Sequence, residues 1–377
     1  MKNRTDSDYC TVRSGEACER LGISRDTLYA YVSRGLVRTI AQPGDARKSL
    51  YDRRDIEALL VRKSRGRSRR SVAESTINWG EPVLISKITR IADGQFYYRG
   101  NNAVEMSRSR TLEDILHTLA GVRSKSPARS KRVFPLQDGL SPFNRILEMM
   151  ARQAIEHRAG DGRPRAGEIM RLTALSAAGC DRCLNVPVHA LLAKEWSDDP
   201  GAADLLRRAL VLCADHELNA STYAARVAAS AGASLPAALL AGLSTLSGTG
   251  HGGITTRFLD WMDGFASGKT LSLQPGDAPP PGFGHPLYPD GDPRARELLR
   301  HCPMPAAWRD AMRQVNDATG ARPSLDFALA LLERHLRLPQ GAALGIFAVG
   351  RTAGWIAHIF EQRRTGRLIR PRAAVDG

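Results

Sequence analysis

From about residue 141 to the end of the chain, apolar residues recur at the spacing of an α-helix. Alanine and leucine dominate these runs, and the β-branched runs that strands prefer are missing. The runs are Phe143–Ile155, Gly167–Leu175, Ala202–Ala214, Thr222–Ala231, Leu235–Leu246, Ile254–Phe265, Ser324–Leu336 and Ala342–Glu361. Because 377 residues can bury a sizeable core, the pattern predicts an all-α region with one large core.

A short β-rich stretch precedes this helical region. Alternation through Ile85–Ile91, the turn signal Asp93-Gly94 and the apolar Phe96–Tyr98 predict a β-hairpin. A helix is expected next, because Thr111 opens a T-L-E-D capping box followed by Ile115, Leu116 and Leu119.

Residues 12–33 predict two short helices. Ser14 is expected to cap the first helix and Ser24 the second, with Gly22 breaking the pattern between them. Their apolar positions are Ala17, Cys18, Leu21, Leu28 and Tyr31. Two short helices joined by a tight turn are typical of a helix-turn-helix motif, whose second helix suits the DNA major groove.

A strand pair is predicted at Gly35–Val37 and Arg47–Tyr51, around the turn signal Gln42–Asp45, and a closing helix at Asp55–Leu60. Together these elements resemble the MerR/excisionase-type winged helix-turn-helix family, so we expect such a domain over residues 1–62. DNA is its expected partner, and a protein-docking module is the alternative. The candidate contacts to phosphates or base edges are Arg25, Thr27, Tyr31, Arg34, Arg47 and Lys48.

The net charge of +15 is unevenly distributed. Residues 1–75 hold 17 Lys and Arg against 10 Asp and Glu, which indicates a polyanionic partner. We predict a basic linker over residues 63–75, disordered when free and able to follow a phosphate backbone. The milder positive charge of the remainder suits a phosphate-bearing ligand.

The chain begins without an apolar leader and has no charge-free run of 18 apolar residues, so we expect a cytoplasmic protein. Its six cysteines do not form a disulfide framework in a chain this long. Cys180 and Cys183 have the spacing of a metal half-site or redox pair, but no second pair follows at zinc-site spacing. Incidental thiols are the favoured interpretation, and we expect no metal.

His251 stands in the glycine-rich stretch Ser247–Ile254, just before a predicted helix. Glycine lets a ligand approach the backbone closely, and a helix start offers free N–H groups. A histidine there is placed to donate a hydrogen bond to an oxygen that gains negative charge during a reaction. A glycine-rich turn without chemistry is the alternative.

Three further stretches contain unusual polar residues. His216 lies between two carboxylates where one apolar helix ends and another begins, and His285 follows a glycine turn in a proline-rich loop. Asp326 is a lone carboxylate at a helix start, where burial raises a carboxyl pKa and the helix dipole lowers it. Each residue alone also has a purely structural explanation.

As an ordered set, these stretches resemble the citrate synthase family. The shared motifs are D-H-E-L-N-A-S at 215–221, H-G-G at 251–253, G-F-G-H at 282–285, D-P-R at 292–294, L-D-F at 325–327, G-R at 350–351 and L-I-R-P-R at 368–372. The resemblance runs from about residue 76 to 372. It implies a mainly helical two-domain fold over residues 76–377, with a smaller mobile subdomain over roughly 254–340.

The resemblance implies a Claisen condensation of acetyl-CoA with oxaloacetate and water to citrate and CoA. Asp326 would be the general base, His251 would donate to the thioester oxygen, and His285 would polarise the oxaloacetate carbonyl. His216, Arg294, Arg351 and Arg370 would hold carboxylates. No cofactor is implied beyond acetyl-CoA as a substrate. The family implies a homodimer in which Arg370 reaches the neighbouring site.

Two departures bear on the substrate. Cys213 stands where many relatives carry a histidine, and Pro286 replaces a common basic residue near the CoA phosphates. Propionyl-CoA, giving 2-methylcitrate, stays open because one methylene discriminates only about 10–200-fold in an apolar pocket. Cleavage of citryl-CoA also stays open, as does a transcription regulator that uses the domain as an acyl-CoA or dicarboxylate sensor.

Overall fold

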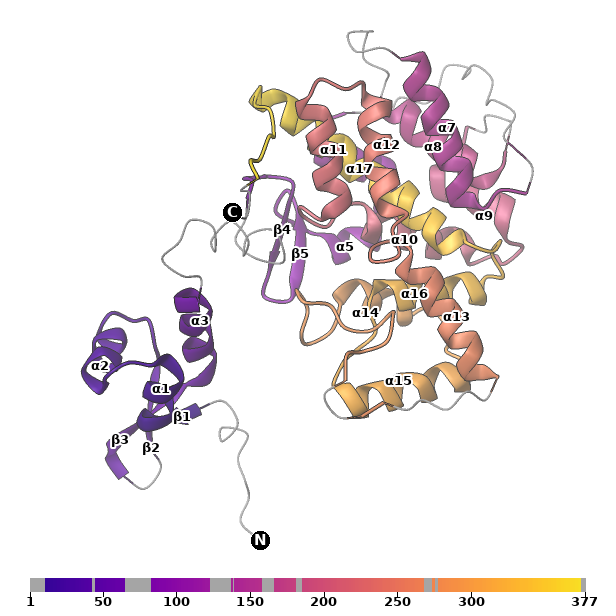
Figure 1. The fold of residues 1–377 in the computed structure, drawn as a ribbon. Coiled ribbons are helices and arrows are strands. Elements are labelled where there is room, and N and C mark those ends of the chain that lie inside the picture. The colour runs from indigo at the N-terminus through magenta and orange to yellow at the C-terminus, as the bar shows by residue number, and fades with distance from the viewer. Residues whose placement is uncertain are drawn as a thin grey trace. The chain divides into compact units, whose positions relative to one another are not determined.

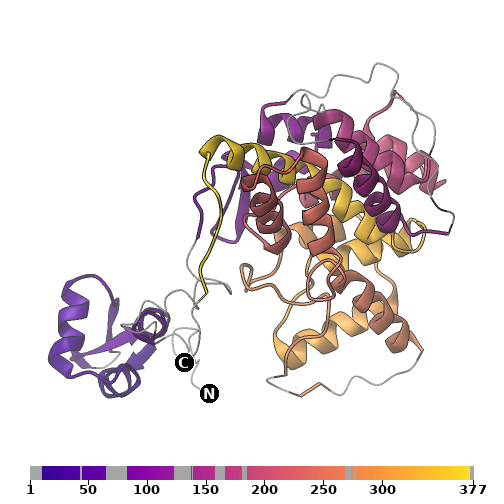
Figure 2. The same cartoon turned by 45° about the horizontal axis from the view of Figure 1, so that its top comes forward.

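The computed structural model describes residues 11–42, 45–64, 83–122, 137, 139–157, 166–180, 185–267, 273–274 and 277–373. The side chains of residues 46–48 and 61–64 lie outside this description. The predicted linker and Cys183 fall largely or wholly outside it as well. The chain divides into two compact units, Met1–Ile85 and Ser86–Gly377, which are drawn in Figures 1 and 2.

The first unit packs three helices against a small antiparallel sheet. Its elements are β1 (Thr11–Arg13), α1 (Ser14–Leu21), α2 (Arg25–Ser33), β2 (Thr39–Gln42), β3 (Asp45–Asp52) and α3 (Arg53–Ser64). The strand order is β1-β3-β2. The unit has its own core, formed by Val12, Ala17, Leu21, Leu28, Val37, Tyr51 and Ile56.

Both predicted short helices are present in this unit, and Ser24 caps α2 by accepting a hydrogen bond from the Thr27 N–H. The prediction that Ser14 caps α1 is wrong, because β1 runs directly into the helix and Ser14 is its first residue. The strand expected at Gly35–Val37 is also wrong. The Gly35 and Leu36 N–H groups donate to carbonyls of α2 and finish that helix, so the strand begins later, at Thr39.

The second unit begins with the predicted hairpin. It comprises β4 (Thr89–Ala92) and β5 (Gln95–Tyr98), with Ile91 opposite Phe96, and a short β6 (Asn101–Asn102) extends it. Ile85 does not belong to the strand and is 91% exposed, so the alternation predicted from Ile85 begins only at Thr89. Helices α5 (Ala103–Ser107) and α6 (Leu112–Ala120) follow, and Thr111 forms the predicted capping box with Asp114.

One long helix, α17 (Ala342–Thr365), runs through the core of the second unit. It packs against α6, α7, α8, α10, α11, α12 and α16. The elements around it include α7 (Pro142–Glu156), α8 (Ala166–Ala178), α9 (Val188–Trp196), α10 (Ala202–Cys213), α11 (Ala220–Ser230) and α12 (Leu235–Leu246). Among the described helices only α17 is long and apolar enough to cross a membrane, and 89% of its apolar window is buried inside the fold. We therefore interpret α17 as a core helix.

Four later helices form a group that lies below α10–α12 in the view of Figure 1: α13 (Ile254–Ala266), α14 (Pro293–Leu299), α15 (Ala306–Thr319) and α16 (Leu325–His335). Aromatic side chains hold three of them together. The ring centroid of Phe258 on α13 lies 5.0 Å from that of Phe327 on α16 and 5.4 Å from that of Trp308 on α15. This packing fixes the starts of α13 and α16, which both carry residues of the candidate site.

Candidate active site

His251 lies on the loop between α12 and α13. Its Nε2 is 2.9 Å from the Ser221 hydroxyl oxygen at the start of α11. The loop passes so close to α12 that a Cβ on Gly252 would lie 2.6 Å from the Leu246 carbonyl oxygen, so a larger residue does not fit there. Burial, assisted by the charge of Arg351, lowers the pKa of His251 to about 4. The imidazole is therefore neutral at pH 7.

The partner of His251 belongs to the cap of α11. Asn219 caps this helix by accepting from the Thr222 N–H at 3.1 Å, and its Oδ1 also lies 2.7 Å from the Ser221 hydroxyl. A serine hydroxyl has one proton to donate. The Ser221 hydroxyl gives that proton to Asn219 Oδ1, so its oxygen accepts from the Nε2–H of His251. Ser221 must turn its proton from Asn219 to Nε2 before His251 can carry a proton on Nδ1 and donate it to an incoming oxygen.

His216 and His285 lie face to edge, with ring centroids 5.1 Å apart. The Tyr288 hydroxyl is 2.8 Å from His216 Nε2. Burial and the charge of Arg294 hold the pKa of His216 well below its usual range and lower that of His285 to about 4, so both imidazoles are neutral at pH 7. His285 Nδ1 accepts from the Leu287 N–H at 3.2 Å, which places the His285 proton on Nε2 as a donor.

Arg294 is held at the start of α14 by Asp292. Two guanidinium nitrogens of Arg294 donate to the two carboxylate oxygens of Asp292 at 2.9 and 2.8 Å, and both residues are buried. The same carboxylate accepts from the Leu325 N–H at 3.1 Å. One ion pair therefore orients Arg294 and also links α14 to the first turn of α16, next to Asp326.

Asp326 is the second residue of α16. Its Oδ1 accepts a 2.6 Å hydrogen bond from the Thr255 hydroxyl on α13. Burial raises the pKa of Asp326, while the Thr255 hydrogen bond and the charge of Arg294 act in the opposite direction; the net shift is upward. A carboxylate with a raised pKa is a stronger base than an exposed one, as proton abstraction requires.

Arg351 lies in the middle of α17 and is almost fully buried. Its Nε donates to the Cys213 carbonyl at 2.8 Å, and its guanidinium carbon lies 4.5 Å from the Phe347 ring centroid. Burial lowers the pKa of Arg351, and its charge in turn lowers the pKa values of His216 and His251. One guanidinium therefore influences both histidines, which places them in one electrostatic environment.

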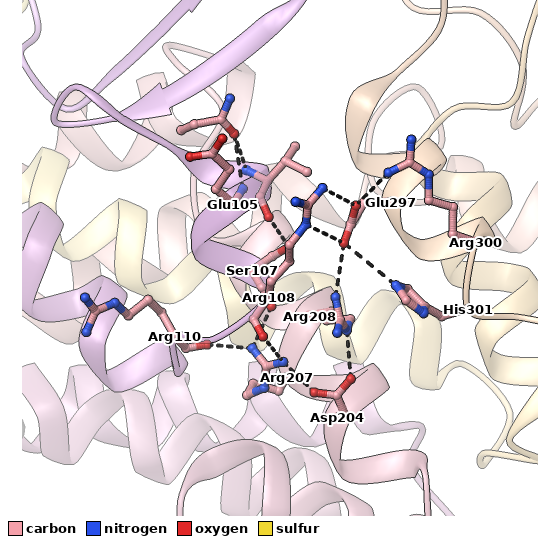
Figure 3. Close-up of polar contacts among 12 residues, drawn as sticks. Glu105, Ser107, Arg108, Arg110, Asp204, Arg207, Arg208, Glu297, Arg300 and His301 are labelled. Carbon is pink, nitrogen blue, oxygen red and sulfur yellow. Dashed lines mark hydrogen bonds and ion pairs between the residues drawn. The ribbon is translucent and has the colours of Figure 1, made fainter.

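A cluster of arginines anchors α14 from the side of α5 and α10 (Figure 3). Its centre is Glu297, which is buried and pairs with Arg208 of α10 at 3.1 Å and with Arg108, just after α5, at 3.3 Å. Arg300 and His301 also lie within 4 Å of the Glu297 carboxylate. Because α14 carries Arg294 as well, this cluster fixes the helix that positions the candidate substrate-binding arginine.

The structure therefore gathers six of the seven predicted residues of the second unit into one electrostatic environment: His216, His251, His285, Arg294, Asp326 and Arg351. Arg370 is exposed in the segment after α17, and none of the contacts of the described residues joins it to this group. Sequence reasoning assigned no role to Tyr288, Ser221, Thr255, Asp292 or Glu297. Ser221 and Asp292 lie inside the motifs and Tyr288 lies three residues after the G-F-G-H motif, but nothing in their spacing indicated their partners.

In the first unit, Arg25 begins α2 and Arg34 follows its end, and both side chains are exposed. The Thr27 hydroxyl is 3.0 Å from the Ser24 hydroxyl in the helix cap, and Tyr31 packs partly against the core. The side chains of Arg47 and Lys48 lie outside the described part of the chain. Cys180 is buried. Among the described residues, no group of three His, Cys, Asp or Glu side chains is placed to hold a metal ion.

Residues 183–372 match the model of the family "Citrate synthase, C-terminal domain", which is half of the chain. The chain belongs to the citrate synthase family. A putative citrate synthase 2 of Mycobacterium tuberculosis is 32% identical over 214 residues, which cover 52% of this chain and 57% of that protein. A citrate synthase of Haloferax volcanii is 36% identical over 200 residues, covering 46% of this chain and 50% of that protein. The matches thus span about half the length of these citrate synthases.

Solved structures of the family share the fold. A citrate synthase of Thermoplasma acidophilum, in ternary complex with carboxymethyl coenzyme A and oxaloacetate, superposes with a TM-score of 0.59 at 20% identity and covers 78% of this chain and 94% of that one. A citrate synthase of Thermotoga maritima gives a TM-score of 0.53, also at 20% identity. The mainly helical citrate synthase-like fold is therefore shared over nearly the whole length of both structures.

Proposed function

We propose that the second unit condenses acetyl-CoA with oxaloacetate and water to give citrate and CoA. The observation that carries this proposal is the partly buried Asp326, a carboxylate with a raised pKa in the same electrostatic environment as two neutral histidines. Removing a proton from carbon needs such a base, together with hydrogen-bond donors for the oxygen that gains charge.

The reaction begins with proton transfer from the acetyl methyl group to Asp326. The electron pair of the broken C–H bond forms the enolate, and His251 stabilises its oxygen by donating a hydrogen bond. The enolate carbon then attacks the oxaloacetate carbonyl carbon, while the Nε2–H of His285 polarises the carbonyl oxygen, which takes up a proton and becomes the hydroxyl group of citryl-CoA. Water finally cleaves the thioester of citryl-CoA and releases CoA.

Three further residues would hold the oxaloacetate carboxylates: His216, Arg294 and Arg351. A guanidinium bonds carboxylate oxygens in pairs, and the buried Arg294 and Arg351 are already oriented by Asp292 and by the Cys213 carbonyl. Fixed orientation of two substrates can lower the barrier by roughly 7–11 kcal/mol. No metal or prosthetic group takes part in these steps.

The test is oxaloacetate-dependent CoA release, followed with a thiol reagent, for the wild type and for Asp326→Asn. The variant keeps the size of the side chain but removes the base, so activity should fall by about 10²–10⁴-fold. Propionyl-CoA is assayed in parallel, because a preference for it would identify a 2-methylcitrate synthase. A folded protein that binds acetyl-CoA and oxaloacetate but releases no CoA from either thioester would instead indicate a ligand sensor.

We propose further that the active form is a homodimer in which Arg370 completes the neighbouring site, which accounts for its exposed position in its own chain. The test mixes Arg370→Ala with Asp326→Ala after dissociation of both proteins. A mixed dimer contains one site with both groups intact, so random reassociation should restore about a quarter of wild-type activity. A mixture as inactive as its components would contradict this arrangement.

For the first unit we propose DNA binding by a winged helix-turn-helix domain, supported by the exposed Arg25 and Arg34 at the two ends of α2. Replacement of either arginine by alanine should weaken binding to genomic DNA fragments. It should also reduce the slope of the logarithm of the binding constant against the logarithm of the salt concentration by about one unit per arginine. Arg53→Ala is the matched control, because Arg53 pairs with Glu57 on α3. Equal binding by all three variants would contradict the proposal.

A further inference from the structure

The first turns of α13 and α16 meet at one hydrogen bond. The Thr255 hydroxyl oxygen is 2.6 Å from Asp326 Oδ1, and Thr255 is only 1% exposed. An ionised carboxylate only accepts hydrogen bonds, so the threonine hydroxyl is the donor. A charge-assisted O–H···O⁻ bond of this length is among the stronger hydrogen bonds in proteins.

We propose that Thr255 is a positioning residue for Asp326, in the reaction proposed above. Its hydroxyl binds Oδ1 and fixes the plane of the carboxylate, which leaves Oδ2 as the oxygen that takes the proton from the acyl-CoA. Thr255 touches no reacting atom in this scheme and acts only through Asp326.

The surrounding structure keeps this donor in place. Threonine is β-branched, so its χ1 torsion has few accessible states in a helix. Phe258, one turn beyond Thr255, contacts Phe327, the residue that follows Asp326, with ring centroids 5.0 Å apart. The Leu325 N–H is in turn held by Asp292 at 3.1 Å. The donor and acceptor therefore lie on two backbones whose separation is fixed from several sides.

Loss of the Thr255 hydroxyl would have two effects. The carboxylate would rotate more freely, and a misplaced catalytic group lowers the rate by about tenfold to a hundredfold. The ionised form of Asp326 would also lose a hydrogen bond, and its pKa would rise further. Because Asp326 acts as a base, the acidic limb of the pH–rate profile would then move to higher pH.

The experiment measures kcat, both KM values and the pH profile of kcat/KM for Thr255→Val, Thr255→Ser and Thr256→Val. The Thr255→Val substitution should lower kcat by about tenfold to a hundredfold, move the acidic limb to higher pH and leave the KM for oxaloacetate nearly unchanged. Thr255→Ser keeps the hydroxyl and should keep the wild-type profile. Thr256→Val is the matched control, because Thr256 is the neighbouring threonine and is exposed.

A structural role alone would lower thermal stability without moving the pH profile, so unfolding of each variant is followed by circular dichroism. Should Thr255→Val fail to fold, Thr255→Ala carries the same expectation with a smaller side chain. A Thr255→Val enzyme with the kcat and pH profile of Thr256→Val would overturn this inference while leaving the proposed condensation intact. A wild type without CoA release would instead refute the proposed condensation itself.

Discussion

Replacement of Gly354 by alanine tests how closely α17 approaches the junction that carries His216. The Gly354 N–H donates to the Ala214 carbonyl at 3.0 Å. A Cβ on residue 354 would overlap both that carbonyl oxygen and Asp215 Oδ1, and would lie 2.8 Å from Asp215 Cβ. Two of these three contacts are to groups that cannot rotate away, because they are backbone or Cβ atoms. The helix and the junction must therefore separate.

The expected cost combines two effects. Forcing an extra methyl group into a packed interior costs about 1–3 kcal/mol, and weakening one buried backbone hydrogen bond costs about 1 kcal/mol. We therefore expect the free energy of unfolding to fall by about 2–4 kcal/mol. Asp215 also binds the Thr89 hydroxyl at 2.5 Å and lies next to His216. Movement of Asp215 away from α17 should displace His216 and therefore raise the KM for oxaloacetate as well.

The assay is urea unfolding followed by circular dichroism, with Gly250→Ala as the control. A Cβ on Gly250 meets no atom within 4 Å, so this control should change stability by less than about 0.5 kcal/mol. An unhindered Gly→Ala change inside a helix stabilises by up to about 1 kcal/mol. A Gly354→Ala protein that is as stable as the wild type, or more stable, would therefore refute the close contact between α17 and the junction.

Two further predictions concern Glu297 and His251. Glu297→Gln removes the negative charge that faces Arg108 and Arg208, so the free energy of unfolding should fall by about 1–3 kcal/mol. The KM for oxaloacetate should rise as well, because Glu297 anchors the helix that carries Arg294. The control Arg300→Gln changes an exposed residue and should change stability by less than about 1 kcal/mol, so equal urea midpoints for both variants would contradict the anchoring role. His251 titrates near 6.5 when unfolded and near 4 when folded, so the unfolded state binds more protons between these values and stability should fall as the pH drops from about 6.5 to about 4. In His251→Gln the urea midpoint should depend less steeply on pH over this range. Identical slopes of urea midpoint against pH for the wild type and the variant would contradict the lowered pKa of His251.

The sequence predicted the long periodic helices well, because their apolar faces are wide. Helix α12 has the predicted bounds, and α7 and α10 differ from prediction by at most one residue at either end. Helix α15 was missed because only Trp308, Ala311 and Val315 are buried along its 14 residues. Helix α14 has seven residues and a proline at its start, so it is too short for its apolar residues to show the periodicity of a helix.

The histidines and Asp326 were predicted from motif resemblance, and the structure places them in one environment. Their partners were not predicted, because each contact joins residues far apart in the sequence. Thr255 lies 71 residues before Asp326, and His216 lies 72 residues before Tyr288. No local spacing encodes such pairs, since they depend on how α11, α13 and α16 pack. Glu297 was missed for the same reason.

The central claim is that Asp326 removes a proton from the methyl group of acetyl-CoA. The most direct measurement follows exchange of the methyl protons of acetyl-CoA with D₂O by NMR, in the presence of a non-reacting oxaloacetate analogue. The wild type should incorporate deuterium, and Asp326→Asn should show no exchange above the buffer rate although it binds both ligands. Equal exchange by the two proteins would contradict the assignment of Asp326 as the base.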